Sequence, residues 1–294
     1  MTPAIEIRGL RKAYGRTQAL DGLDMTVRPK TVYGFLGVNG AGKTTTLGIL
    51  SGFLKSDGGR CAVNGSLSSL PQDAKLFSGR SVASQLVFLA RLSGTSGKRA
   101  KSEAERVLQL VGLGERPRSA PEKLSHGMRK RVSFAQALLG DPEIILLDEP
   151  TAGLDPQNAS EIKKLIVSLG REKTVVVSSH VLAEIEEMCT EVGVIQEGKM
   201  RFEGPVSELT RTRARVNYRL SGRAEPPAVR EFPGVQAADF DADAATLTVV
   251  FDPAAISVEE LNRRVFALLG RENIGVREIM LGRSLEEGFL DLLK

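Results

Sequence analysis

The sequence contains no tryptophan, two cysteines and two histidines among its 294 residues, and these shortages limit what the chain can do. Cys61 and Cys189 stand far apart without metal-site spacing, so we expect reduced thiols rather than a disulfide framework or a zinc site. No stretch approaches the roughly 18 uninterrupted apolar residues that span a bilayer, and the first residues lack a signal-peptide pattern. We therefore expect the chain to stay on the side of the membrane where it is made.

A strong excess of one charge is also missing. The 40 basic residues face 36 acidic ones, which leaves a net charge of +4. A composition of 41% hydrophobic and 26% charged residues is ordinary for a globular protein, and the length allows one large domain and one small one. The mild basic excess indicates neither nucleic acid nor an anionic membrane by itself.

What the sequence does contain is a phosphate-binding pattern. Residues 37–45 read Gly-Val-Asn-Gly-Ala-Gly-Lys-Thr-Thr, between an apolar run and a helix-like stretch. The glycines let backbone N–H groups converge on phosphate oxygens, and the following helix adds its dipole. Lys43 supplies a charge between the β- and γ-phosphates, and the Thr44 hydroxyl suits a magnesium ion. The spacing is that of a P-loop, which alone does not separate a kinase, a GTPase and a transport ATPase.

Two polar residues near predicted strands are candidates for contact with a nucleotide. Residues 5–27 alternate like antiparallel strands and contain Tyr14, which can stack on a base or be an ordinary core or surface residue. Gln72 follows an apolar strand and a proline. It would lie at a strand's carboxyl end, where ligands of parallel sheets bind, or be a solvated loop amide.

Between residues 82 and 114 the pattern becomes helical. Ser102 and Glu105 have the spacing of a capping box, which predicts the start of a helix there. The basic run at residues 97–101 is then a solvated turn. This block predicts a helical insertion in an otherwise α/β domain.

Further along, polar residues end two predicted strands and begin a helix. Asp148 and Glu149 follow four apolar residues, so we expect two carboxylates at the end of a buried parallel strand. Asp148 can hold magnesium while Glu149 polarises an attacking water. His180 ends another strand and is either functional or an ordinary histidine. Ser125 begins a predicted helix, as a second anion site or only an N-cap.

In order and spacing, these motifs resemble the ATPase subunits of ABC transporters over about residues 4–210. The resemblance implies an α/β fold: a P-loop NTPase (ABC ATPase) core at residues 1–210 with an antiparallel β subdomain and a helical subdomain at about residues 73–135. It implies catalytic roles for Lys43, Gln72, Glu149 and His180, and magnesium ligation by Thr44, Gln72 and Asp148. The ATP contacts that it implies are Tyr14, Gly37, Asn39, Gly40, Ala41, Gly42, Lys43, Thr44, Thr45, Ser125, Gly127 and Asp155.

The resemblance also implies partners and a location. Two copies, or this chain and a homologous ATPase subunit, would face head to tail around two MgATP, with Ser125 and Gly127 of one copy capping the ATP of the other. A separate transmembrane permease would receive the motion, so we expect a cytoplasmic protein at the inner face of the cell membrane. No nucleic-acid partner is expected.

Two departures from the family pattern stand out. Residues 124–128 read Leu-Ser-His-Gly-Met where Leu-Ser-Gly-Gly-Gln is commoner. This change is similar to that in bacterial export ATPases for drugs, antibiotics and polysaccharides. The segment between Gly65 and Gln72 is also shorter than usual, which bears on how Gln72 couples to a membrane partner.

Residues 211–294 differ in style and predict a small C-terminal α+β accessory domain. Strands are predicted near residues 216–220, 235–240, 245–251 and 274–280, and Ser257 with Glu260 predicts a helix cap. Ser284 with Glu287 predicts the cap of a last helix. The ending resembles the C-terminal extension of the same export ATPases, which favours dimer contact or regulation; a stabilising appendage is the alternative.

Other functions are less consistent with the sequence. A soluble ABC ATPase acting on ribosomes or nucleic acid would carry two ATPase halves or a long coiled-coil insertion, and neither pattern is present. A module that binds ATP without turnover is disfavoured by Lys43, Glu149 and His180, although the altered signature leaves it open. An importer stays open within the transporter class.

Overall fold

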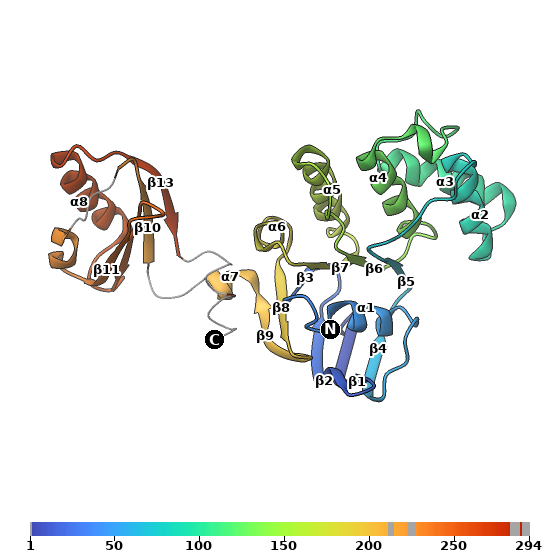
Figure 1. Ribbon diagram of the computed structural model, residues 1–294, viewed down its shortest axis with the longest axis horizontal. Coiled ribbons are helices and arrows are strands. Elements are labelled where there is room, and N and C mark those ends of the chain that lie inside the picture. Colours follow the sequence, from blue (N-terminus) through green and yellow to red (C-terminus); the bar gives the residue numbers. More distant parts are fainter. Residues whose placement is uncertain (1, 211–214, 223–226, 283–288, 290–294) are drawn as a thin grey trace. The chain divides into compact units, whose positions relative to one another are not determined.

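The computed structural model describes residues 2–210, 215–222, 227–282 and 289. The chain forms two compact units, Met1–Pro205 and Val206–Lys294. Figure 1 labels their helices and strands. The domain boundary predicted after residue 210 stays a prediction. None of the described helices has the length and apolar character needed to cross a bilayer.

A six-stranded sheet forms the centre of the first unit, in the order β5-β6-β7-β3-β8-β9 (Figure 1). The neighbours from β5 to β8 pair in parallel, and β9 is antiparallel to β8. The strands β3, β6 and β7 are buried along their whole length, which fits the apolar runs that they contain. The strands are β3 (Val32–Leu36), β5 (Leu67–Leu70), β6 (Ile144–Asp148), β7 (Thr174–Ser179), β8 (Glu191–Gln196) and β9 (Lys199–Pro205).

The register of this sheet brings three strand ends together. Leu36 of β3 pairs with Ser179 of β7, and Asp148 of β6 pairs with Ser178. The carboxyl ends of β3, β6 and β7 therefore meet at one edge, which is where parallel sheets bind their ligands.

A second, antiparallel sheet has the order β2-β1-β4, with β1 (Ile5–Tyr14), β2 (Thr17–Val27) and β4 (Gly58–Val63). Helix α1 (Lys43–Leu50) lies between this sheet and the larger one (Figure 1). Leu47 and Leu50 of α1 are buried in one cluster with Ile5, Leu23 and Leu146, so both sheets and the helix share a core.

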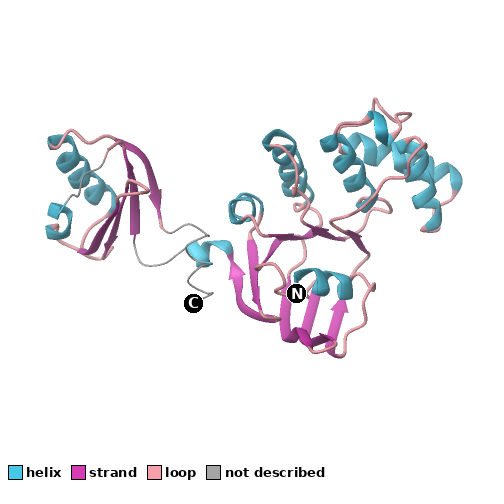
Figure 2. Cartoon of the chain, viewed as in Figure 1, coloured by secondary structure: helices cyan, strands magenta, loops and turns pink. Residues whose placement is uncertain are grey.

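The remaining helices of this unit form two groups. Helices α5 (Pro156–Leu169) and α6 (Leu182–Met188) lie on the face of the large sheet away from α1 (Figure 2). Helices α2 (Val82–Leu92), α3 (Gly97–Leu110) and α4 (His126–Ala137) gather beyond β5, with the short 3₁₀ turn η1 (Pro121–Lys123) before α4. With its parallel and antiparallel sheets, this unit confirms the predicted fold class.

The start of α3 corrects the sequence prediction. The helix begins at Gly97 with Ser96 as its N-cap, so residues 97–101 are helical and not a turn. Ser102 lies inside the helix, where its hydroxyl donates to the carbonyl O of Lys98 at 3.5 Å. Ala100 and Ala104 are buried on the side of the helix that also buries Val107 and Leu108, and this burial favours the earlier start over a cap at Ser102.

The second unit has its own sheet and core. After α7 (Val206–Thr210), the antiparallel strands β11 (Val235–Asp241), β12 (Thr246–Phe251), β10 (Arg215–Leu220) and β13 (Val276–Leu281) form a sheet in that order. Helix α8 (Val258–Arg271) and the 3₁₀ turn η2 (Pro227–Glu231) pack with it, and Ser257 caps α8 by accepting from the N–H of Glu260 at 3.2 Å, as predicted. The cap predicted at Ser284 and Glu287 lies outside the described residues.

Candidate active site

Lys43 begins α1 and folds back over the loop that precedes it. Its Nζ donates to the carbonyl O of Gly37 at 2.6 Å and lies 3.4 Å from that of Val38. Lys43 is 7% exposed, and burial lowers the pKa of its ammonium group while Glu149 and Asp148 oppose the shift. Phosphate oxygens bind an ammonium more strongly than a neutral carbonyl does, so an entering nucleotide can take over this group.

The loop requires glycine at the position before the helix. Gly42 has a φ of 112°, and a Cβ at this position would lie 2.7 Å from the carbonyl O of Ala19 on β2. Its own carbonyl accepts from the N–H of Thr46 at 2.9 Å, which closes the first turn of α1. Asn39 and Gly40 are exposed beside this helix N-terminus, whose free N–H groups form an anion site.

Asp148 ends β6 within reach of the P-loop. The Thr44 hydroxyl donates to Asp148 Oδ2 at 3.1 Å, and the Ser178 hydroxyl donates to Asp148 Oδ1. A hydroxyl and a carboxylate are the hard oxygen donors that Mg²⁺ prefers, and this ion keeps phosphate and water as its other ligands. Among the described residues, no cluster of three or more His, Cys, Asp and Glu side chains forms a metal site.

Glu149 and His180 form the second polar pair of the site. Nδ1 of His180 lies 2.9 Å from each carboxylate oxygen of Glu149. The Glu149 side chain is 10% exposed and that of His180 is 56% exposed, so the imidazole lies on the solvent side of the pair. Glu149 has a φ of 49°, an uncommon left-handed conformation for this residue type. Such conformations concentrate at functional sites, where surrounding contacts hold them.

Ser178 is the residue of this cluster that the sequence reasoning missed. Besides bonding Asp148, its Oγ accepts from the backbone N–H of Glu149 at 3.1 Å. One buried hydroxyl on β7 therefore bonds the carboxylate of Asp148, which ends β6, and the backbone of Glu149, which follows it. The sequence does place Ser178 near the predicted strand end at His180. Its role could not be predicted from this position, because it depends on β6 and β7 being neighbours in the sheet.

Tyr14 and Gln72 lie at the positions where the sequence predicts them, without a described contact to the P-loop. Tyr14 ends β1 and is 48% exposed, with the Lys12 ammonium 5.6 Å from its ring centroid. Gln72 follows β5, as predicted, and its side chain makes no hydrogen bond among the described residues. The roles of both side chains stay predictions.

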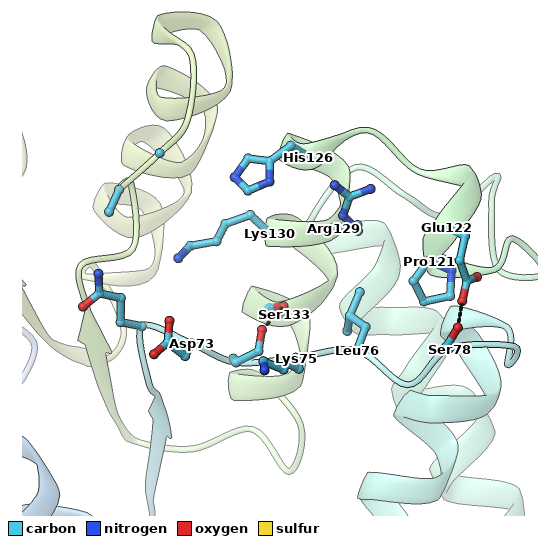
Figure 3. Close-up of a pocket in the computed structure, with 14 residues that line it drawn as sticks. Asp73, Lys75, Leu76, Ser78, Pro121, Glu122, His126, Arg129, Lys130 and Ser133 are labelled. Atoms are coloured by element: carbon cyan, nitrogen blue, oxygen red, sulfur yellow. Dashed lines mark hydrogen bonds between the residues drawn. The ribbon is translucent and has the colours of Figure 1, made fainter.

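A cleft of about 740 Å³ opens beside Gln72 rather than over the P-loop (Figure 3). Lys130 reaches from α4 toward the side of the cleft where Asp73 lies. Burial lowers the pKa of Lys130, and Asp73, Asp148 and Glu149 oppose the shift, so this ammonium lies in the field of both site acids. The cleft is lined by Gln72, Asp73, Ala74, Lys75, Leu76, Ser78, Pro121, Glu122, His126, Arg129, Lys130, Ser133, Ala152 and Gly153.

The predicted ATP contacts at residues 125, 127 and 155 lie where α4 and α5 begin. Ser125 caps α4 by accepting from the N–H of Met128 at 3.2 Å, which confirms the predicted helix start. Asp155 caps α5 by accepting from the N–H of Asn158 at 3.1 Å. In the part of the chain that the structure describes, no hydrogen bond joins Ser125, Gly127 or Asp155 to a P-loop residue.

Comparison with known proteins gives a consistent result. The family model described as "ABC transporter" matches residues 20–152. The chain is 35% identical to the bacitracin transport ATP-binding protein of Bacillus licheniformis, over 79% of each chain. It is 33% identical to the daunorubicin/doxorubicin resistance ATP-binding protein of Streptomyces peucetius, over 99% of this chain and 92% of the relative.

Solved structures agree with the sequence relatives. A cbiO1 structure from Clostridium perfringens, described as part of the ABC transporter complex cbiONQ, superposes with a TM-score of 0.65 at 29% identity. The match covers 71% of this chain and 91% of that one.

Proposed function

Because the chain belongs to the ATP-binding proteins of ABC transporters, it is an ATPase that acts in transport, and we propose that it drives export through a separate membrane subunit. Two copies would bind head to tail around two MgATP. The proposal rests on one observation: the carboxyl ends of β3, β6 and β7 bring a set of polar residues to the same edge of the sheet. These residues are Lys43, Thr44, Asp148, Glu149 and His180.

In this proposal Glu149 accepts a hydrogen bond from the attacking water. Its carboxylate is bonded to His180 and its N–H to Ser178, so its orientation is set before the substrate arrives. Lys43 and the N–H groups that begin α1 would neutralise charge on the transferred phosphoryl group. The exposed side of His180 is available to the γ-phosphate.

Magnesium would be held by Thr44 and Asp148, with Gln72 as a further predicted ligand. Its charge would offset that of the phosphates when it is bound with ATP. The Thr44 hydroxyl and Asp148 Oδ2 lie 3.1 Å apart, so the two oxygen donors are near one another.

A second copy would complete each site. Ser125 and Gly127 make no described contact with the P-loop of their own chain, which supports a role on the ATP of the partner. Hydrolysis would remove the γ-phosphate that bridges the two surfaces, so the pair could reopen. This opening and closing is the motion that the membrane subunit would receive.

The membrane subunit would dock on the helical side of the first unit, at the cleft beside Gln72. Phe77 and Phe88 contact one another edge to face, with ring centroids 6.4 Å apart, and are 51% and 48% exposed. Leu92, one turn further along α2, is 68% exposed. Exposed apolar side chains beside a cleft are typical of protein interfaces. This docking would place the chain at the inner face of the membrane.

The relatives support export as the direction of transport. One is named for bacitracin transport, one for daunorubicin and doxorubicin resistance, and one, of Paraburkholderia xenovorans, for Nod factor export. We infer an export ATPase of this branch, whose cargo is bound by the membrane subunit.

The test compares the ATPase activity of the purified chain with that of Glu149→Gln. Losing the carboxylate should lower kcat by about 10²-fold or more, because a positioned general base contributes about 10²–10⁴-fold. The variant should still bind MgATP and accumulate as a dimer, which light scattering would detect. Equal turnover of both proteins would contradict the role of Glu149. No turnover and no dimer in either protein would contradict a pair of two identical copies. Such a chain either needs its membrane subunit or a non-identical ATPase partner, or binds ATP without hydrolysing it.

A further inference from the structure

Helices α4 and α5 meet at Gly127 and Asn158. A Cβ at position 127 would lie 2.2 Å from Asn158 Oδ1 and 2.3 Å from its Cγ, so the amide group of Asn158 fills the space over Gly127. The same amide bonds Asp155: Nδ2 of Asn158 donates to Asp155 Oδ2 at 2.6 Å. One side chain thus touches the turn that begins α4 and the turn that begins α5.

Two neighbouring contacts keep these helix starts aligned. Arg131 Nη1 forms an ion pair with Glu161 Oε2 at 2.9 Å, one turn further along each helix. A Cβ at Gly153, just before Asp155, would lie 3.7 Å from Nε2 of His126. The two turns therefore lie side by side: Asn158 packs on Gly127 of α4 and hydrogen bonds Asp155 within its own turn.

We propose that Asn158 is a positioning residue that joins the turn of Gly127 and the turn of Asp155 into one unit facing the nucleotide of a second copy. The inference rests on the proposed function, in which both turns act on the ATP of the partner. A linked pair of turns is already ordered before the copies meet, so closure loses less conformational entropy than it would with two independent turns.

The chemistry of asparagine fits this task. The amide supplies a donor to Asp155 and a flat surface against Gly127. Leucine at position 158 would keep the volume but lose the donor. Aspartate would keep the shape but set one carboxylate against another, which is unfavourable when both are charged.

The experiment uses the full chain carrying Glu149→Gln. This variant should hydrolyse ATP slowly, so we expect the ATP-bound dimer to accumulate. Sedimentation gives the dimer dissociation constant with saturating MgATP, and a fluorescent ATP analogue at low protein concentration gives binding to the single copy. We expect Asn158→Leu and Asn158→Asp to weaken dimerisation by about tenfold or more, because the two turns would then have to be ordered when the copies meet. Nucleotide binding to the single copy should not change. Gln157→Leu, at an exposed neighbour on the first turn of α5, is the control and should dimerise like the parent.

The outcomes separate this inference from the proposed function. If the Glu149→Gln parent does not dimerise with MgATP, the head-to-tail pair itself is wrong. If the parent dimerises and both Asn158 variants dimerise equally well, Asn158 is not a positioning residue. Should Asn158→Leu fail to fold, the isosteric Asn158→Asp decides. A drop in both dimerisation and single-copy binding would mean a general loss of structure and would overturn the inference.

Discussion

At the scale of single residues, Lys43 and Glu149 are both held by their own chain. The ammonium of Lys43 is bonded to Gly37 and Val38, and the carboxylate of Glu149 to His180. The sequence predicted these side chains because a P-loop and a pair of acids after an apolar strand are local patterns. Their present partners could not be predicted, since His180 reaches Glu149 only through the pairing of β6 with β7.

Lys43 leads to a pH-dependent prediction. Burial lowers the pKa of Lys43 in the free chain, and the phosphates of a bound nucleotide would raise it again. Between these two pKa values, binding must take up a proton, so ATP affinity should fall as pH rises, starting below the pH at which an ordinary lysine titrates. Titrations with a fluorescent ATP analogue from pH 7.5 to 10 would measure this.

Lys43→Arg is the matched control, because arginine stays protonated throughout this range. The ATP affinity of this variant should not change with pH, even if the longer side chain fits poorly and makes the affinity weaker. An affinity of the wild-type chain that is equally level would show that the burial of Lys43 does not influence binding.

At the scale of elements, the strands and most helix starts follow from local patterns, while the contacts between elements do not. Ser125 and Ser257 are correctly predicted caps, and each accepts from the backbone N–H three residues further along its helix. The cap predicted at Ser102 was wrong, because Ser96 is a second candidate for the start of α3. The burial of Ala100 favours the start at Ser96. Ser178 was missed because its importance arises from the strand beside it.

Ser178→Ala tests this contact between strands. The change would remove the hydroxyl that donates to Asp148 Oδ1, while the N–H of Glu149 would lose one of two partners and keep its bond to the backbone carbonyl O of Ser178 at 3.2 Å. A buried polar group that loses its partner costs about 1–3 kcal/mol, so unfolding by urea should begin at a lower concentration. Turnover should fall as well, because both acids lose an orienting bond. Ser178→Thr keeps the hydroxyl and is the control; equal effects of both substitutions would mean that packing at this site matters and the hydrogen bonds do not.

At the scale of the whole molecule, each of the two units has a hydrophobic cluster of its own among the described residues. Leu23 and Leu146 belong to the cluster of the first unit, and Tyr218 and Leu261 to that of the second. The sequence predicted the second unit from its change of pattern but offered no catalytic group in it. Its role as a dimer contact, a regulator or a stabilising part stays a prediction, because each concerns a partner.

Separate cores predict separate responses to nucleotide. Since the chain has no tryptophan, Tyr14→Trp and Phe266→Trp would place one fluorescent reporter in each unit. MgATP at 100 times its dissociation constant should stabilise the first unit by about 2.7 kcal/mol and leave the second unit's transition unchanged. If MgATP moves the urea unfolding transitions of both reporters by the same amount, the two units unfold as one.

The hydrogen bonds from Lys43 to Gly37 and Val38 have a consequence for the rate of nucleotide capture. A P-loop that its own lysine already closes is preorganised. The chain then meets the ordering cost of the loop when it folds rather than each time ATP arrives. Capture should therefore be a single step whose rate rises linearly with ATP concentration in a stopped-flow experiment, without the plateau of a slow loop rearrangement.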